Sequence, residues 1–367
     1  MKIVVTGTRG IPDVMGGVET HCEELFPRLV ELGYDITVIR RSAYVHDALN
    51  DWHGVKLVDI PAPKHKSFEA IIHTIKAFRY AKKIGADVVH VHSIGPALVI
   101  PYGKWNGQKV VFTHHGPDYM REKWGWLAKR ILQLGEYFAA KYADRMIVIS
   151  EEIRNIIACK YGRVKDVSLI YNGVQPPEYC FDHEYFKALG IKQNRYVLGM
   201  SRIVPEKNLH HLIEAFNLLK EENRIPANFK LVIAGDSDFD DRYSHKLKEK
   251  ARKSGVVLTG FVKGRRLHSL LTNCCCYCLP SSHEGLPIAL LEAMSYNLPV
   301  VVSDIAPNLE VKLPQDCYFK CGDVRALADG IEKWINKGKS VRVDYDLTPY
   351  DWDSIAQQVA EVYESLR

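Results

Sequence analysis

Residues 2–10 read KIVVTGTRG, an apolar run followed directly by a loop that contains two glycines. A helical spacing of apolar residues then extends from Val18 to Leu32, and a second apolar run occupies residues 35–40. A strand, a glycine loop, a helix and a second strand, in this order, are the opening of a doubly wound parallel sheet. The first forty residues therefore predict an α/β fold.

The same alternation continues along the chain and then starts again. Further apolar runs lie at residues 87–91, 109–113 and 145–149, as strands buried on both faces require. The turn-rich stretch YNGVQPP at residues 171–177 interrupts the pattern and is typical of a linker. A second series of runs follows at residues 196–200, 229–234, 256–259, 275–279 and 299–303. We therefore predict two Rossmann-like doubly wound parallel-sheet domains facing across a cleft, residues 1–172 and 173–349.

Composition and length agree with a globular protein of this size. Hydrophobic residues make up 47% of the 367 residues and charged residues 25%, which are ordinary values. No run approaches the ~20 apolar residues of a membrane-spanning helix, and Met1 leads into the first strand without a signal-peptide pattern, so we expect a cytoplasmic protein. The nine cysteines, four of them within residues 274–278, are expected to be reduced and packed as small hydrophobes rather than to bind a metal.

The positive charge is concentrated in the first half of the chain. Residues 1–170 contain 24 Lys and Arg against 18 Asp and Glu, whereas the whole chain has a net charge of +5. This excess is too small to predict nucleic-acid binding. It is compatible with an anionic partner, such as a phosphate-bearing acceptor or a negatively charged membrane surface, and equally with a solvated basic face.

Polar residues follow two strands of the second domain, and ligands of parallel sheets bind at the carboxyl ends of strands. Arg202 and Lys207 come after the run at 196–200 and precede a helix predicted to begin at Leu209. Two cations near a helix N-terminus favour a diphosphate. Two surface cations without a ligand are the alternative interpretation.

Two carboxylates follow the run at 275–279. Glu284 precedes an apolar helical stretch that contains Glu292, and a separation of eight positions is a little over two helical turns. A carboxylate in such surroundings needs hydroxyl donors, which sugars and ribose supply. A pair of carboxylates is also found in glycosidases, but these do not need the phosphate-binding cations.

Motifs along nearly the whole chain resemble those of the retaining glycosyltransferases of family 4, the glycosyl transferases group 1, which have the GT-B fold. They are Gly16-Gly17-Val18-Glu19, Asn172-Gly173-Val174, Arg202 with Lys207, Glu284-Gly285 through Glu292-Ala293-Met294, and Pro299-Val300-Val301. Residues 6–12 and 123–125 are similar to a bacterial subgroup that includes rhamnosyltransferases of surface polysaccharides. The resemblance implies transfer of a sugar from a nucleotide-sugar with retained configuration. It also implies that the helix at 350–367 crosses back to complete the first domain, which holds the acceptor.

The resemblance also implies individual roles. Gly16 and Gly17 approach the donor diphosphate, and Arg202 and Lys207 neutralise it. Glu284, with Gly285 and Leu286, holds the transferred sugar. Glu292 binds ribose, and Phe261 and Val262 lie beside the base, with residues 303–310 flanking the donor pocket. His115 lies beside the sugar, although the adjacent His114 allows a shift of one residue.

No cofactor or metal is expected, although two features of the sequence resemble other kinds of site. Asp236-Ser237-Asp238 fits a short acidic motif that holds a divalent cation in another glycosyltransferase fold, but Arg202 and Lys207 already supply positive charge. An NADP-dependent oxidoreductase could use Arg40 and Arg41 for a 2′-phosphate, but the glycines of the first loop do not have the Gly-x-Gly-x-x-Gly spacing. A non-catalytic protein that binds sugar nucleotides is the third alternative.

The segment 119–143 contains Trp124, Trp126, Lys129, Arg130 and Tyr137. Tryptophans beside cations are typical of a membrane interface. We therefore expect a glycan or lipid-linked acceptor and peripheral contact with the inner face of a membrane. A core helix with a basic outer face is the alternative.

Overall fold

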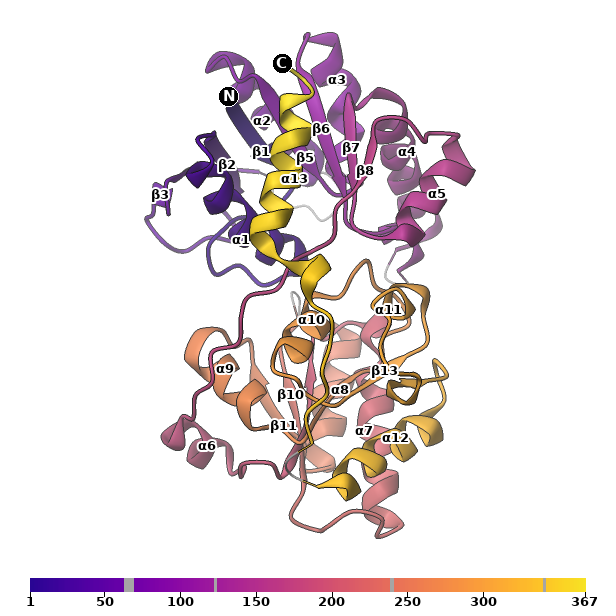
Figure 1. Ribbon diagram of the computed structural model, residues 1–367. Coiled ribbons are helices and arrows are strands. Elements are labelled where there is room, and N and C mark those ends of the chain that lie inside the picture. The colour runs from indigo at the N-terminus through magenta and orange to yellow at the C-terminus, as the bar shows by residue number, and fades with distance from the viewer. Residues whose placement is uncertain (63–68, 122–123, 238–240, 339–340) are drawn as a thin grey trace. The chain divides into compact units, whose positions relative to one another are not determined.

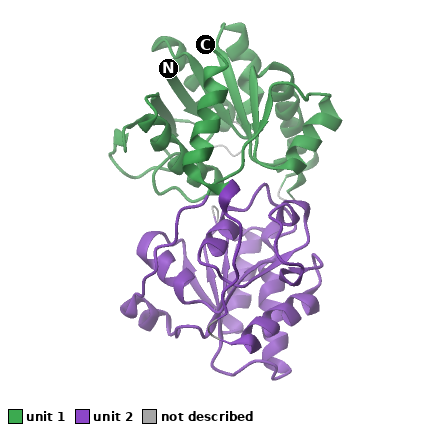
Figure 2. Ribbon diagram, viewed as in Figure 1, with its two compact units in different colours: residues 1–173, 350–367 green, residues 174–349 purple. Residues whose placement is uncertain are grey.

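A computed structural model describes residues 1–62, 69–121, 124–237, 241–338 and 341–367. The chain divides into two compact units, shown in different colours in Figure 2. Unit 1 comprises Met1–Gly173 with Tyr350–Arg367, and unit 2 comprises Val174–Pro349. Each unit is built around its own parallel sheet.

Unit 1 contains an eight-stranded sheet in the order β3-β4-β2-β1-β5-β6-β7-β8. Its neighbouring strands are parallel except for the β3–β4 pair. The strand order reverses between β1 and β5, where the loops that follow these two strands diverge. The bounds are β1 Lys2–Thr6, β2 Asp35–Arg41, β3 Asp51–Trp52, β4 Val55–Ile60, β5 Val88–His92, β6 Lys109–His114, β7 Arg145–Val148 and β8 Val167–Leu169.

Helices accompany this sheet, and the last of them comes from the C-terminus. Figure 1 shows α13 in yellow beside the strands of unit 1, where Trp352, Ile355 and Tyr363 join the core formed with residues of α1 and β1. Asp351 begins α13 by accepting a hydrogen bond from the Ser354 backbone. The helices of unit 1 are α1 Gly17–Glu31, α2 Glu69–Lys83, α3 Ile100–Trp105, α4 Trp126–Tyr142, α5 Glu151–Tyr161 and α13 Trp352–Glu364, with short 3₁₀ turns η1 Pro96–Val99 and η2 Asp118–Met120. The turn η5 Thr348–Tyr350 spans the boundary where unit 2 ends and the chain returns to unit 1.

Unit 2 contains a six-stranded parallel sheet in the order β11-β10-β9-β12-β13-β14. Numbered along the chain, this is the order 3-2-1-4-5-6 of the dinucleotide-binding Rossmann sheet. The order reverses between β9 and β12. The strands are β9 Tyr196–Met200, β10 Lys230–Ala234, β11 Val257–Gly260, β12 Cys276–Leu279, β13 Val300–Ser303 and β14 Tyr318–Phe319.

The helices of unit 2 follow its strands as a doubly wound sheet requires. A capping aspartate begins three of them: Asp182 at α6, Asp241 at α8, where it forms a capping box with Ser244, and Asp323 at α12. The helices are α6 His183–Leu189, α7 Leu209–Glu221, α8 Arg242–Lys253, α9 Gly264–Asn273, α10 Ile288–Ser295, α11 Ala306–Leu309 and α12 Val324–Lys337, with 3₁₀ turns η3 Pro205–Lys207 and η4 Gln315–Cys317.

The predicted α/β class with two Rossmann-like parallel sheets is confirmed. The expected strands at residues 2–6 and 196–200 have the bounds of β1 and β9, whereas β3, β4, β8 and β14 were not predicted. The cysteines at 274–276 and 278 are buried, and within the described chain they do not form a group that could hold a metal ion. Burial raises the pKa of the Cys274 thiol, in keeping with a packed neutral side chain.

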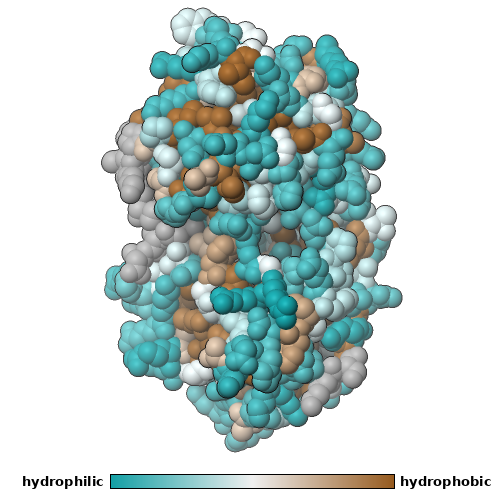
Figure 3. All heavy atoms as spheres, turned by 90° about the vertical axis from the view of Figure 1, so that its left-hand side faces the viewer, coloured by the Kyte–Doolittle hydropathy of each residue, from teal (hydrophilic) through white to brown (hydrophobic). Residues whose placement is uncertain are grey.

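None of the helices in the part of the chain that the structure describes is a candidate to span a membrane. No helix there combines the length and the apolar character needed to cross a bilayer. The face drawn in Figure 3 is largely hydrophilic, with hydrophobic residues gathered in smaller groups.

Candidate functional site

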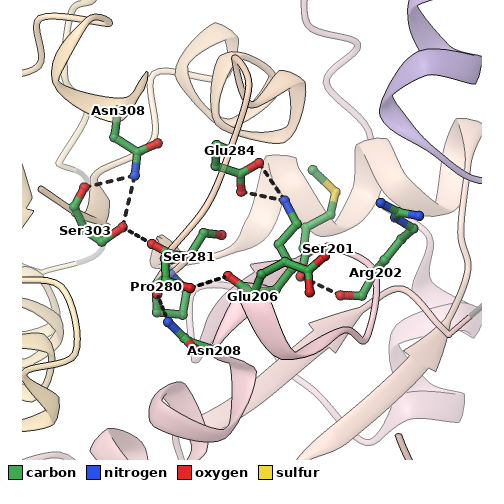
Figure 4. Close-up of polar contacts among 12 residues, drawn as sticks. Ser201, Arg202, Glu206, Asn208, Pro280, Ser281, Glu284, Ser303 and Asn308 are labelled. Atoms are coloured by element: carbon green, nitrogen blue, oxygen red, sulfur yellow. Dashed lines mark hydrogen bonds and ion pairs between the residues drawn. The ribbon is translucent and has the colours of Figure 1, made fainter. Parts of the chain in front are cut away.

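Two loops of unit 2 meet where the order of its strands reverses. The loop after β9 contains Arg202 and Lys207, and the loop after β12 contains Glu284. The backbone joins them, because Ser282 N donates to Glu206 O at 2.9 Å. The amide of Asn208 donates to Pro280 O at 3.1 Å (Figure 4). The two loops are therefore held together by the residues on both sides of Lys207.

The central contact of this site is an ion pair. Lys207 Nζ lies 2.5 and 2.6 Å from the two carboxylate oxygens of Glu284. Only 17% of the Lys207 side chain and 7% of the Glu284 side chain are exposed, so water screens the pair less than it screens a surface pair. Lys207 ends the 3₁₀ turn η3, and Asn208 after it adopts a left-handed conformation with φ of 48° before α7 begins.

Arg202 lies in the same loop, two residues after β9, and is partly buried. The predicted helix at Leu209 is confirmed by α7, although η3 precedes it and contains Lys207. The two cations therefore come from the segment between a strand and a helix N-terminus. That arrangement is well suited to an anion.

Glu284 and Glu292 both act electrostatically on one buried phenol, that of Tyr277. Glu284 lies in the loop before α10, and Glu292 lies within that helix. Burial raises the pKa of Tyr277 well above its usual range, and the charges of Glu284 and Glu292 raise it further. The structure thus brings both predicted carboxylates to one region, next to the end of β9, where Tyr277 donates to Met200 O.

The loop of Glu284 rests on a hydrogen-bonded support that sequence reasoning did not identify. Ser303 Oγ donates to Ser281 O at 2.5 Å, and the amide of Asn308 donates to Ser303 O at 2.9 Å and Ser303 Oγ at 3.1 Å. All three residues are fully buried. The predicted flanking segment 303–310 therefore contacts the loop after β12, as Figure 4 shows.

The remaining predicted residues of unit 2 lie in separate places around this centre. Gly285 and Leu286 continue the loop of Glu284, and Leu286 is buried. Phe261 and Val262 directly follow β11, and 44% of Phe261 is exposed. Strands β10 and β9 separate β11 from the loop of Glu284 in the sheet.

In unit 1, Gly16 and Gly17 begin α1. Gly16 has a φ of 149°, and a Cβ there would lie 2.1 Å from Glu19 Oε2, so the turn requires glycine. A Cβ at Gly17 would meet no atom within 4 Å. Burial raises the pKa of Glu19, but the charge and hydrogen bonds of Arg9 lower it by more, so the Arg9–Glu19 pair is ionised and fixes the loop below Gly16.

The two histidines at the end of β6, His114 within the strand and His115 after it, have different surroundings. His114 is buried: its Nε2 contacts Glu136 Oε1 at 3.0 Å, and its Nδ1 accepts from Gly116 N at 3.1 Å. His115 is partly exposed, and its Nε2 lies 2.8 Å from Nδ1 of His92. His114 is thus packed, and His115 faces the loops at the carboxyl edge of the sheet. His21 and His92, which approach His115, were not predicted.

The cations proposed for a 2′-phosphate are already paired with protein carboxylates. Arg40 is fully buried, and its guanidinium contacts Asp59 at 2.6 Å and Asp47 at 2.8 Å. Arg41 lies 3.7 Å from Glu69. This arrangement does not favour the oxidoreductase alternative.

The acidic motif at residues 236–238 is only partly described. Asp236 forms an ion pair with Lys248 at 2.8 Å. Asp238 and Asp240 lie outside the described residues, as does Lys123 of the expected rhamnosyltransferase-like segment.

Comparison with known proteins places both halves of the chain in one group. Residues 181–345 match the family Glycosyl transferases group 1, and residues 15–177 match Glycosyltransferase Family 4. An uncharacterised glycosyltransferase of Methanocaldococcus jannaschii is 26% identical over 99% of this chain and 98% of its own. An Escherichia coli α-1,3-galactosyltransferase, named for UDP-Gal and GlcNAc-diphosphoundecaprenol, is 29% identical over 84% of this chain and 81% of its own.

Solved protein structures share the fold of this chain along its whole length. Anabaena HepE in complex with UDP and glucose superposes with a TM-score of 0.79 at 20% identity, covering all of both chains. Sucrose-phosphate synthase from Thermosynechococcus elongatus has a TM-score of 0.81 at 17% identity, covering 100% of this chain and 98% of its own. With the two family matches spanning both Rossmann-like units, the chain belongs to the group 1 glycosyltransferases of family 4 and has their GT-B fold.

Proposed function

We propose that the protein transfers a sugar from a nucleotide-sugar, bound mainly by unit 2, to a glycan or lipid-linked acceptor with retention of anomeric configuration. The observation that carries the proposal is the Lys207–Glu284 pair beside Arg202 at the point of strand-order reversal. Ligands of doubly wound sheets bind there. HepE, solved with UDP and with UDP-glucose, supports a donor of this kind.

The two cations of the site and the carboxylate of Glu284 bind different parts of the donor. Arg202 and Lys207 neutralise the diphosphate, and Glu284 accepts hydrogen bonds from sugar hydroxyls. Because Lys207 contacts both oxygens of Glu284, it also fixes the orientation of the carboxylate that holds the sugar. Glu292, partly buried on α10, accepts from the ribose hydroxyls.

Leaving-group stabilisation is the main contribution to the reaction. When the bond between the sugar and the diphosphate breaks, negative charge develops on the departing phosphate, and preorganised cations stabilise it more strongly than they stabilise the donor. The departing phosphate accepts the proton of the acceptor hydroxyl. His115 lies beside the sugar, and Gly17 allows the diphosphate to approach α1 closely. No divalent metal is required, because Arg202 and Lys207 supply the charge.

The acceptor side is assigned to unit 1, at the inner face of a membrane in surface-polysaccharide synthesis. Helix α4 exposes a hydrophobic stripe, formed by Trp126, Leu127, Ile131, Leu134 and Tyr137, while its buried side consists of small residues and Glu136. These exposed apolar side chains support a membrane contact over the alternative of a core helix with a basic outer face. An exposed apolar stripe next to Arg130 and Lys141 fits an interface of apolar lipid and anionic headgroups. The acceptor named for the E. coli relative is lipid-linked.

A panel of nucleotides tests the proposed donor site. At 100 times its dissociation constant a donor stabilises the folded protein by roughly 2.7 kcal/mol, which raises the melting temperature measurably. We expect a shift with one class of nucleotide-sugar among UDP-glucose, UDP-galactose and dTDP-rhamnose, and none with NADPH. A shift with NADPH alone would support the oxidoreductase, and binding without transfer to any acceptor extract would support a non-catalytic protein.

A further inference from the structure

Three imidazoles from separate elements of unit 1 converge where its strand order reverses. His21 lies on α1, which follows β1, His92 ends β5, and His115 follows β6. One ring nitrogen from each lies within 4.8 Å of the others. The rings of His92 and His115 are stacked with centroids 5.1 Å apart, and His21 meets His115 edge-on at 4.9 Å.

Their hydrogen bonds leave ring nitrogens without protein partners. His21 Nδ1 lies 3.0 Å from the amide oxygen of Asn172, and an amide oxygen only accepts, so Nδ1 carries the proton and Nε2 presents a lone pair. His21 Nε2 and His92 Nε2 are buried, and neither has a hydrogen-bond partner among the described residues. Buried polar atoms of this kind are rare in folded proteins and call for a ligand or an ordered water.

The neighbouring histidines, His90 and His114, have protein partners for both ring nitrogens. Both nitrogens of His90 are engaged, Nδ1 with Tyr363 Oη at 2.6 Å and Nε2 with Thr113 Oγ1 at 2.7 Å. Both nitrogens of His114 are engaged as well. The fold thus satisfies the two histidines that flank the group and leaves nitrogen sites free within it.

We propose that His21, His92 and His115 form a binding site for a borderline transition-metal ion such as Zn²⁺. Three imidazoles and one open position are a common set of ligands for this ion, whereas Mg²⁺ and Ca²⁺ prefer oxygen. Asn172 supplies the second-shell contact that fixes the tautomer and the ring orientation of His21. His115, partly exposed, leaves the fourth position to water or an anion.

Binding has a defined chemical balance. In the free protein one proton is shared across the 2.8 Å contact between His92 Nδ1 and His115 Nε2. When both residues act as ligands, this hydrogen bond is broken and its proton stays on His92 Nδ1. His92 then donates the lone pair of Nε2 and His115 that of its own Nε2, so three neutral imidazoles bind the ion and no proton is released. No redox step and no additional reactant are involved.

Metal binding by the full-length, untagged protein tests the site directly. We expect one equivalent of Zn²⁺ after dialysis, visible absorption of a four-coordinate complex with Co²⁺ without thiolate charge-transfer bands, and no competition from Mg²⁺. His21→Ala and His92→Ala should remove this binding, and Asn172→Ala should weaken it by about 10- to 100-fold. The control is His73→Ala, a buried histidine of unit 1 outside the group, which should bind as the wild type does.

Two results would overturn the site. One is a wild-type protein that retains no Zn²⁺ or Co²⁺, a measurement that does not depend on whether any variant folds. The other is an ion bound elsewhere, seen either as undiminished binding by folded His21→Ala and His92→Ala variants or as a thiolate spectrum that places the metal on cysteines.

An activity measurement separates this inference from the proposed function, on which the next expectation rests. If His115 lies beside the transferred sugar, Zn²⁺ should inhibit transfer, and His21→Ala should be less sensitive to it. Metal binding without inhibition would support the site and contradict the role of His115. Transfer by a protein that binds no metal would contradict the site and leave the proposed function intact.

Discussion

Lys207 and Glu284, which are 77 positions apart in the chain, form a nearly buried ion pair in which one ammonium contacts both carboxylate oxygens. Such a pair is costly to break from one side, because the remaining charge is left without compensation. In the proposed enzyme the pair joins the phosphate site to the sugar site. Substitutions at its two ends should therefore have different effects on ligands.

Replacing Lys207 should mainly reduce turnover. Lys207→Ala removes a charge-assisted contact worth roughly 1.5–3 kcal/mol, or more as charge develops on the leaving group, so kcat should fall by at least ~10-fold. Initial rates at saturating donor measure this, with circular dichroism as the control for folding. Lys220→Ala, a lysine on α7 outside the site, is the matched control. Unchanged turnover in folded Lys207→Ala would contradict the assignment to the leaving group.

Substitutions of the two glutamates should have different effects on the affinity for nucleoside diphosphate alone, measured by calorimetry. Glu292→Ala should weaken this binding, because Glu292 is assigned to ribose. Glu284→Ala should leave it nearly intact or strengthen it, since Lys207 loses its protein partner, while binding and transfer of the sugar decline. If both folded variants lose affinity for the diphosphate equally, the sugar and ribose roles are wrong even in an active glycosyltransferase.

Transfer should not depend on divalent metal. After treatment with EDTA and exchange into metal-free buffer, the initial rate should not fall, and Mg²⁺ or Mn²⁺ should not raise it. Arg202 and Lys207 provide the positive charge that a cation provides elsewhere. Restoration of a lost activity by Mn²⁺ would contradict this and favour the acidic segment at 236–238 as a site for a divalent cation.

The exposed apolar stripe of α4 should determine how much of the protein sediments with lipid vesicles. Leu127→Ser combined with Ile131→Ser removes two exposed apolar side chains and should lower cosedimentation with anionic vesicles at low salt. Leu32→Ser, an exposed leucine directly after α1, is the control. Equal recovery of the wild type with neutral and anionic vesicles would oppose an anionic membrane partner.

The free energy of unfolding should decrease at acidic pH because of Glu136. Burial raises the pKa of Glu136, but hydrogen bonding and charge from His114, with hydrogen bonds from Lys160 and Tyr161, lower it to about 2 from 4.5. The contribution to the free energy of unfolding, roughly 3 kcal/mol, is present above the unfolded-state pKa and is lost as the pH falls from about 4.5 to about 2. The difference in free energy of unfolding between the wild type and Glu136→Gln, measured with urea, should therefore be full at pH 7 and shrink as the pH falls from about 4.5 toward about 2. A constant difference would exclude an ionised Glu136 as the cause.

The strands buried on both faces were predictable, whereas β4, which is partly exposed, and the short edge strands were not. Strands such as β1 and β9 are buried on both faces, so their apolar residues run continuously and identify them. β3 and β14 contain two residues each, and β8 contains three partly exposed ones. Segments this short have no periodicity of their own, because their conformation is set by pairing with a neighbouring strand.

The sequence by itself determined the two Rossmann-like sheets and placed Arg202, Lys207 and Glu284 in loops after strands, since local apolar runs and helix starts depend on nearby residues. Tertiary structure alone decided which of these side chains meet. The Lys207–Glu284 pair requires β9 and β12 to be neighbours, and the group of His21, His92 and His115 requires α1, β5 and β6 to meet at one edge. Such contacts follow from strand order over long separations in the chain, which no local pattern of residues encodes.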